Sequence, residues 1–201
     1  MRLGYLSEKY EGAGPDTIST GEGDSGGVSY GTYQLATNTG SVVAFVNWLL
    51  NRHDYGKGYG EYLQPYEPGT AEFSEAWRHL AKTDRDGFAT LQDEYAKPQY
   101  YEAAANMLRS RDIEPDNWPE ALQMSLFANA VQHGPFYAAQ LFAEAMQHTS
   151  EPEDILWNVY QIKLTDMSWS KGAESLRPGL FARWQSERDD AIKILKGEYE
   201  V

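Results

Sequence analysis

Two carboxylates near the N-terminus, Glu11 and Asp24, flank a stretch rich in glycine, serine and threonine. Hydrolysis of a glycosidic bond requires one carboxylic acid to protonate the leaving oxygen and one carboxylate to activate water or attack the sugar. Glu11 follows Tyr10, and apolar neighbours of that kind raise the pKa of a carboxyl group. From spacing alone, however, the simpler explanation is that Glu11 caps a helix and Asp24 makes a turn, and Glu22 competes for either role.

Hydroxyl, aromatic and amide side chains follow these carboxylates directly, at Ser29, Tyr30, Tyr33 and Gln34. Beside two carboxylates on a glycine-rich loop, such side chains are typical of a sugar-binding cleft. Each of them alone is explained more simply by packing in a core or a hairpin. His133 is a further candidate contact for substrate, although a histidine near a helix end is more often buried and bonded to a backbone carbonyl.

A short helix and a hairpin would position these residues. Residues 5–11 predict a helix with Ser7 as its N-cap, and the glycines and proline at 12–15 end it. The segment 17–31 predicts an irregular two- or three-stranded hairpin, with strands at 17–19 and 28–30 and a turn over 21–27. Residues 30–37 contain β-formers and could equally begin a short helix. Because apolar residues are sparse here, we expect a functional loop rather than core.

Helical periodicity dominates the rest of the chain. Apolar residues recur every three to four positions around 42–50, 73–81, 86–95, 101–108, 122–131, 138–146, 152–162 and 181–195. Residues 54–69, 112–119 and 168–178 are interpreted as loops. The predicted fold class is α+β and mainly α, with about eight helices and a small N-terminal β-hairpin element. The length fits a single domain, 1–201, with an active-site loop at 11–35 and a helical body at 40–201.

The composition limits the classes of function. A formal net charge of -13 disfavours nucleic acid, because phosphate binding requires a basic face, and it suits a cationic substrate, although solubility alone explains it. The absence of cysteine excludes disulfides and thiolate catalysis. His53, His79 and His148 lack the spacing of a metal site, and no cofactor is implied. We expect neither a membrane span nor a signal peptide.

Residues 11–35, and above all the run from Ile18 to Leu35, resemble the lysozyme-like glycoside hydrolases of phage endolysins. They are also similar to the muramidase effector domains at the end of type VI secretion proteins, including VgrG-type spike proteins. These domains are distant relatives of the chitosanases in the lysozyme superfamily. The similarity extends to 73–95, 130–134 and 181–187, so it covers most of the chain, and a motif of this length is far more specific than a lone glycine pattern.

This resemblance implies a lysozyme-like fold in which Glu11 is the general acid and Asp24 the second catalytic carboxylate. It also implies a cleft lined by the side chains around Tyr30, Tyr33 and Gln34. Glycines 26, 27 and 31 would keep the backbone close to the sugar chain. Residues 10–14, Tyr-Glu-Gly-Ala-Gly, depart from the Glu-Ser-Gly-Gly of the resemblance, so we expect the loop after the acid to differ in shape.

The sequence thus predicts a muramidase that cuts the β-1,4 glycan of peptidoglycan between N-acetylmuramic acid and N-acetylglucosamine, as an endolysin or an antibacterial effector. A chitosanase is the first alternative, and a non-catalytic glycan-binding module is the second. Inverting, retaining and transglycosylase outcomes stay open, since they depend on the separation of the carboxylates.

The expected partners are glycan strands and, for an effector, an immunity protein. A holin or a secretion apparatus would deliver the chain from the cytoplasm to the cell wall.

Overall fold

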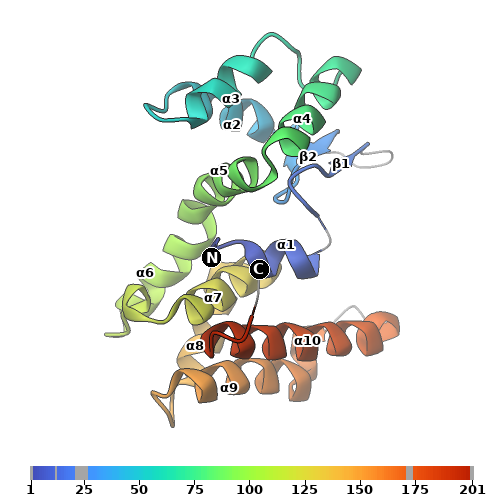
Figure 1. Ribbon diagram of the computed structural model, residues 1–201. Coiled ribbons are helices and arrows are strands. Elements are labelled where there is room, and N and C mark those ends of the chain that lie inside the picture. The colour runs from blue at the N-terminus through green and yellow to red at the C-terminus, as the bar shows by residue number, and fades with distance from the viewer. Residues whose placement is uncertain (1, 12, 21–26, 171–173, 200–201) are drawn as a thin grey trace. The chain divides into compact units, whose positions relative to one another are not determined.

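The computed structural model describes residues 2–11, 13–20, 27–170 and 174–199, and for Glu11 it describes the backbone alone. The chain divides into two compact units. One comprises Glu11–Ala96, and we call it the sheet unit. The other comprises Met1–Tyr10 and Lys97–Val201, and we call it the helical unit. The strands in Figure 1 belong to the sheet unit, and both chain termini belong to the helical unit.

The sheet unit contains a small antiparallel sheet of two-residue strands: β1 (Ile18–Ser19), β2 (Ser29–Tyr30) and β3 (Leu35–Ala36). Strand β2 is central, because Tyr30 pairs with Ile18 on one side and with Leu35 on the other. The hairpin predicted at 17–31 is therefore confirmed with two strands, β1 and β2, and the third strand of the sheet comes from the region 30–37, whose structure the sequence left open. Residues 31–34 form a turn, so the region from 30 to 37 does not begin a helix.

Helices enclose the aromatic core of the sheet unit. They are α2 (Ser41–Leu50), α3 (Gly56–Leu63), α4 (Ala71–Thr83) and α5 (Arg85–Lys97), the last of which ends on the first residue of the helical unit. Thr70 caps α4, because its hydroxyl accepts a hydrogen bond from the Phe73 N–H at 3.2 Å. Trp77 is fully buried and packs edge-to-face on Phe88 with ring centroids 4.8 Å apart.

Helix α3 corrects the prediction that residues 54–69 form a loop. Its glycines, at positions 56, 58 and 60, are turn signals in a sequence. In the structure Gly60 is buried, and a Cβ added to it would lie 2.8 Å from the backbone nitrogen of Leu50 on α2. Glycine therefore serves close packing between α2 and α3, while Leu63 at the end of α3 is fully buried in the core.

The helical unit opens with α1 (Tyr5–Glu11), which confirms the helix predicted at 5–11. Ser7 lies inside α1 and is only 1% exposed, so its predicted role as N-cap is wrong. The later elements are η1 (Pro98–Glu102, a π-helix), α6 (Ala103–Arg109), η2 (Pro115–Asn117), α7 (Glu120–His133), α8 (Pro135–Ala145), α9 (Pro152–Thr165), η3 (Met167–Ser170), η4 (Glu174–Leu176) and α10 (Arg177–Leu195).

Helix α7 forms the centre of the helical unit. Every residue from 124 to 130 is buried, and α7 packs against both α8 and α10. Helices α9 and α10 lie side by side (Figure 1). The predicted fold class, α+β and mainly α, is confirmed. In the parts of the chain that the structure describes, no helix has both the length and the apolar character needed to cross a bilayer.

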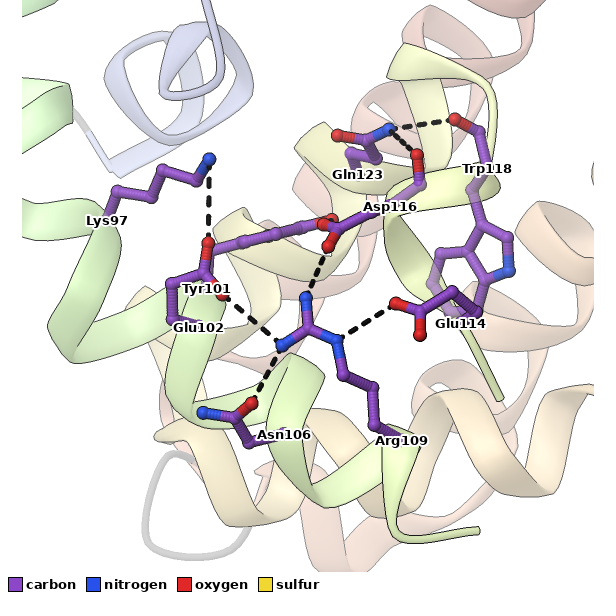
Figure 2. Close-up of polar contacts among 9 residues, drawn as sticks. All are labelled: Lys97, Tyr101, Glu102, Asn106, Arg109, Glu114, Asp116, Trp118 and Gln123. Atoms are coloured by element: carbon purple, nitrogen blue, oxygen red, sulfur yellow. Dashed lines mark hydrogen bonds and ion pairs between the residues drawn. The ribbon is translucent and has the colours of Figure 1, made fainter. Parts of the chain in front are cut away.

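Arg109 holds the segment between α6 and α7 through hydrogen bonds and ion pairs (Figure 2). At the end of α6, Arg109 donates through Nε to Glu114 at 2.9 Å, and its other nitrogens bond Asp116 and Glu102. The hydroxyl of Tyr101 donates to the same Asp116 at 3.0 Å. A planar guanidinium shared among three carboxylates fixes their geometry, so side-chain bonds help to order this connection.

Candidate active site

Of the two residues predicted to supply the catalytic carboxylates, the structure describes the backbone of Glu11 alone. Glu11 is the last residue of α1, as the sequence predicted. Asp24 and its competitor Glu22 lie outside the described residues, as does Gly26. The catalytic roles of Glu11 and Asp24 therefore stay predictions.

The end of α1 that leads into Glu11 is fastened to α10. Asp190 accepts hydrogen bonds from the Tyr10 hydroxyl and from Lys9 Nζ, each at 2.5 Å. Burial opposes ionisation of Asp190, but the bonds from Lys9 and Tyr10 outweigh it and hold the pKa of this carboxyl below its ordinary value. At the other end of α1, the Tyr5 hydroxyl donates to that of Tyr199 at 3.0 Å. The helix that ends at Glu11 is thus held by part-buried hydrogen bonds, of which the two to Asp190 are charge-assisted.

The loop after Glu11 is fastened to the core of the sheet unit through one carbonyl. The Pro15 carbonyl accepts from Trp77 Nε1 at 2.8 Å and from Gln92 Nε2 at 3.1 Å. Gln92, 1% exposed, also accepts through Oε1 from the Thr32 N–H at 2.9 Å. One buried amide therefore joins the loop after Glu11 to the turn between β2 and β3. The range 73–95, to which the resemblance extends, includes Gln92, but the sequence gave this residue no role.

Gly31 brings the backbone of this turn close to the core. Its N–H donates to the Thr17 carbonyl at 2.7 Å, and its φ is +73°. A Cβ at this position would lie 2.9 Å from the Trp77 ring and closer still to the amide of Gln92. Within the described residues, the backbone at Gly31 approaches Trp77 and Gln92 closely, and its predicted approach to the sugar chain stays a prediction.

Ser29 and Tyr30 lie in the central strand and are buried. Tyr30 has no exposed surface, and its ring packs edge-to-face on Phe73 with centroids 5.0 Å apart. Its hydroxyl accepts from the Gly69 N–H at 3.0 Å and is 3.0 Å from Ser74 Oγ. Ser29 is 8% exposed. The structure gives both residues a packing role, and their binding of substrate stays a prediction.

Tyr33 and Gln34 lie in the turn that follows β2. The half-buried Tyr33 donates through its hydroxyl to Asp93 Oδ1 at 2.8 Å. Gln34 is exposed, has a φ of +50° and donates through Nε2 to the Gly31 carbonyl at 2.9 Å. The structure therefore brings the four predicted hairpin contacts into strand β2 and the turn that follows it, and of these Gln34 is the exposed one. The buried carboxylate of Asp93, 4% exposed, was not foreseen.

His133 ends α7 and belongs to the helical unit, whereas the hairpin residues belong to the sheet unit. Burial, and then the positive charges of Lys163 and Arg183, lower the pKa of His133 to about 3, so its ring is neutral at pH 7. Its Nε2 is buried and has no hydrogen-bond partner among the described residues. The backbone-carbonyl bond expected of a helix-end histidine is not made at this atom.

Lys163 on α9 is a buried charge that the sequence reasoning missed. It has no exposed surface, and its Nζ donates to Asn129 Oδ1 at 2.7 Å and to Gln132 Oε1 at 2.9 Å. The ammonium also lies 4.7 Å from the centre of the Trp184 ring. Lys163 follows Val159 by four residues and so lies on the apolar face of α9. A lysine at an apolar position of a helix is the sequence feature that could have indicated this buried charge.

The fold has solved relatives among polysaccharide hydrolases. The native chitosanase from Bacillus subtilis MY002 superposes with a TM-score of 0.56 at 18% identity, over 99% of this chain and 90% of that one. A mutant of that chitosanase complexed with 6 GlcN gives a TM-score of 0.55 over the same shares. At this identity the likeness concerns the fold, and this chain therefore has a chitosanase-like, lysozyme-type fold.

The chain belongs to the family of type VI secretion system spike protein VgrG3-like C-terminal domains, whose model matches residues 3–188. It is 32% identical to the type VI secretion system spike protein VgrG3 of Vibrio cholerae serotype O1 (strain ATCC 39315 / El Tor Inaba N16961) over 134 residues, or 66% of this chain. The match covers 12% of the length of that spike protein. The resemblance to VgrG-type domains is thereby confirmed at the level of the family.

Proposed function

We propose that this chain is a muramidase that hydrolyses the β-1,4 bond between N-acetylmuramic acid and N-acetylglucosamine in bacterial peptidoglycan. The observation that carries the proposal is the presentation of Glu11. Glu11 ends a helix anchored through Tyr10, and the loop that follows is bonded through Pro15 to the core of the sheet unit, in a chain with a chitosanase-like fold. An anchored backbone suits a general acid, because small displacements reduce its efficiency strongly.

In this proposal Glu11 protonates the glycosidic oxygen as the bond breaks. Asp24 acts as the base on a water in an inverting reaction, or as nucleophile or ion stabiliser in a retaining one. A carboxylate separation of about 5–5.5 Å would favour retention, and one of about 6.5–9.5 Å inversion. Residues 1–201 act as one catalytic domain, in which Tyr33, Gln34 and His133 each contact the glycan, while the buried Ser29 and Tyr30 support the turn that carries Tyr33 and Gln34.

Replacement of Asp24 by asparagine distinguishes hydrolysis from lytic transglycosylation. A transglycosylase needs the acid alone, since the sugar's own hydroxyl closes on the reacting carbon. We expect Asp24→Asn to lose most of its activity on peptidoglycan while its folding is unchanged. Full activity of this variant, with 1,6-anhydro ends on the products, would replace hydrolysis by transglycosylation in the proposal.

Chitosan is the second candidate substrate, favoured by the chitosanase fold and by the net charge of -13, which suits a polycation. Digestion of peptidoglycan sacculi and of chitosan in parallel, with mass spectrometry of the soluble products, decides between the two. Fragments from sacculi with reducing N-acetylmuramic acid ends support the muramidase, whereas fragments from chitosan alone make the chain a chitosanase. Inertness on both polymers would leave a non-catalytic glycan-binding module.

Membership of the VgrG3-like family favours an antibacterial effector over a phage endolysin. In this proposal a type VI secretion apparatus carries the domain to the cell wall of another bacterium, whereas an endolysin would depend on a holin. A producing strain must then protect its own wall, and an immunity protein that covers the cleft would do so. Affinity capture from the producing strain tests this partner, and recovery of no protein that inhibits the enzyme would count against it.

A further inference from the structure

A pocket of about 600 Å³ opens in the helical unit between the end of α7, helix α8 and the turn η3. A volume of this order accommodates a small ligand or a few sugar rings. Nothing in the proposed reaction, apart from the single residue His133, makes use of it. Its walls include Gln132, His133, Tyr137, Gln140, Glu144 and Trp169.

Aromatic rings form one wall of this pocket. Tyr137 on α8 is 56% exposed, and its ring stands edge-to-face to Trp169 with centroids 6.4 Å apart. Trp169 in turn stands edge-to-face to His133 at 5.1 Å. An exposed aromatic ring at a pocket offers an apolar surface to the C–H face of a sugar, while the rim remains open to its hydroxyls.

Polar groups complete the pocket in a way that suits hydroxyl and amide partners. A neutral imidazole both donates and accepts, and Nε2 of His133 has no partner among the described residues. Gln140 and Glu144 add an amide and a carboxylate on α8. Neither lysine nor arginine occurs among the described lining residues, which disfavours phosphate or another anion.

We propose that this pocket binds a segment of a β-1,4-linked hexosamine chain, with one ring stacked on Tyr137 and its polar groups bonded to Gln140 and His133. The inference rests on the proposed function for the choice of ligand, because the enzyme must hold a glycan longer than the bond it cuts. It extends that function by assigning a binding site to α8 and η3.

Calorimetric titration of Glu11→Gln with hexamers of N-acetylglucosamine and of glucosamine tests the site, because this background binds without cutting. Adding Tyr137→Ala should weaken binding of at least one hexamer about tenfold, which corresponds to about 1.4 kcal/mol. Gln140→Ala is a second variant at an exposed position and should weaken it as well. Phe136→Ala is the matched control, since Phe136 is the neighbour of Tyr137, is similarly exposed at 52% and does not line the pocket.

Equal affinities in Tyr137→Ala, Gln140→Ala and the Phe136→Ala control would overturn the site, and so would failure of both hexamers to bind. The hexamer that responds distinguishes an N-acetylated glycan from chitosan as the source of the ligand. Cleavage is measured separately with the parent chain. If the parent cuts neither polymer while Tyr137→Ala still weakens binding of a hexamer, the proposed reaction is refuted and the proposed binding site is supported.

Discussion

At residue scale, Gly31 and Gly40 offer a matched test of how tightly the turn after β2 is packed. Both have a φ of +73°, so alanine at either position adopts a left-handed backbone that costs roughly 1–2 kcal/mol. A Cβ at Gly40 meets nothing within 4 Å, whereas one at Gly31 overlaps Trp77 and Gln92. We therefore expect Gly31→Ala to lower the free energy of unfolding by more than Gly40→Ala does, through about 1–3 kcal/mol of overpacking. Urea denaturation measures both, and equal losses would contradict the close approach.

The buried imidazole of His133 gives a second prediction at this scale, on pH. Its pKa is about 3 when folded, against the ordinary value near 6.5, so the unfolded chain binds the extra proton between these values. Stability is therefore complete above pH 6.5 and falls as the pH drops toward 3, by at most about 1.4 kcal/mol per pH unit. His133→Asn should flatten this part of the profile relative to the parent. Parallel profiles would show that His133 does not titrate in this way.

Single-residue roles were harder to predict than their positions. The sequence placed Glu11 at a helix end and Tyr30 in a strand, and both positions are correct. It could not show that the Tyr30 ring fills the core, because an aromatic residue in a glycine-rich hairpin suits a cleft and a core equally. The roles of Gln92 and Lys163 were missed for a related reason. Each lies on a helix face whose other residues are mostly apolar, and its hydrogen-bond partners are distant in the sequence.

At the scale of elements, helix α1 positions the proposed acid, Glu11, which is its last residue. Tyr10 directly precedes Glu11, and Tyr10→Phe removes the hydroxyl that donates to Asp190. Tyr5→Phe removes the hydroxyl that donates to Tyr199, at the opposite end of the same helix. We expect Tyr10→Phe to lower kcat on peptidoglycan about tenfold with little change in KM, because the acid would lose its alignment. Tyr5→Phe should leave kcat near the parent value. Equal kcat values for the two variants would deny Tyr10 a positioning role.

The connection from α6 to α7 depends on Arg109, whose partners Glu114 and Asp116 lie in the loop (Figure 2). These carboxylates raise the pKa of the guanidinium further, so its charge is permanent. We expect Arg109→Ala to lower the melting temperature, because three carboxylates would lose their common partner. Arg111→Ala is the control, since Arg111 is exposed and no ion pair to it is found among the described residues. A melting temperature unchanged in both variants would make the network dispensable.

Among the elements, periodicity predicted the helices well and failed where glycine intervened. The faces at 42–50 and 73–81 became α2 and α4, because apolar residues on one face have to be buried. Helix α3 was missed, since Gly56 and Gly60 indicate a turn when their neighbours are unknown. Close packing against α2 is a tertiary property, and no local pattern contains it.

At the scale of the whole molecule, the fold class followed from the alternation of a short β element and many helices, and the family followed from one long motif. The division into a sheet unit and a helical unit could not be predicted from the sequence, because no composition shift or linker marks residue 96. Helix α5 crosses that boundary without interruption, ending at Lys97. A domain boundary inside a continuous helix leaves no signal in the sequence.

The central claim is that Glu11 is the acid that cuts the peptidoglycan glycan. Digestion of purified sacculi by the parent and by Glu11→Gln, with mass spectrometry of the soluble fragments, tests it most directly. The account predicts fragments with reducing N-acetylmuramic acid ends from the parent. With the variant it predicts a loss of at least a hundredfold in their yield, because an amide cannot donate the proton, and an unchanged melting temperature. Parent-like digestion by Glu11→Gln, or no fragments from the parent, would contradict it.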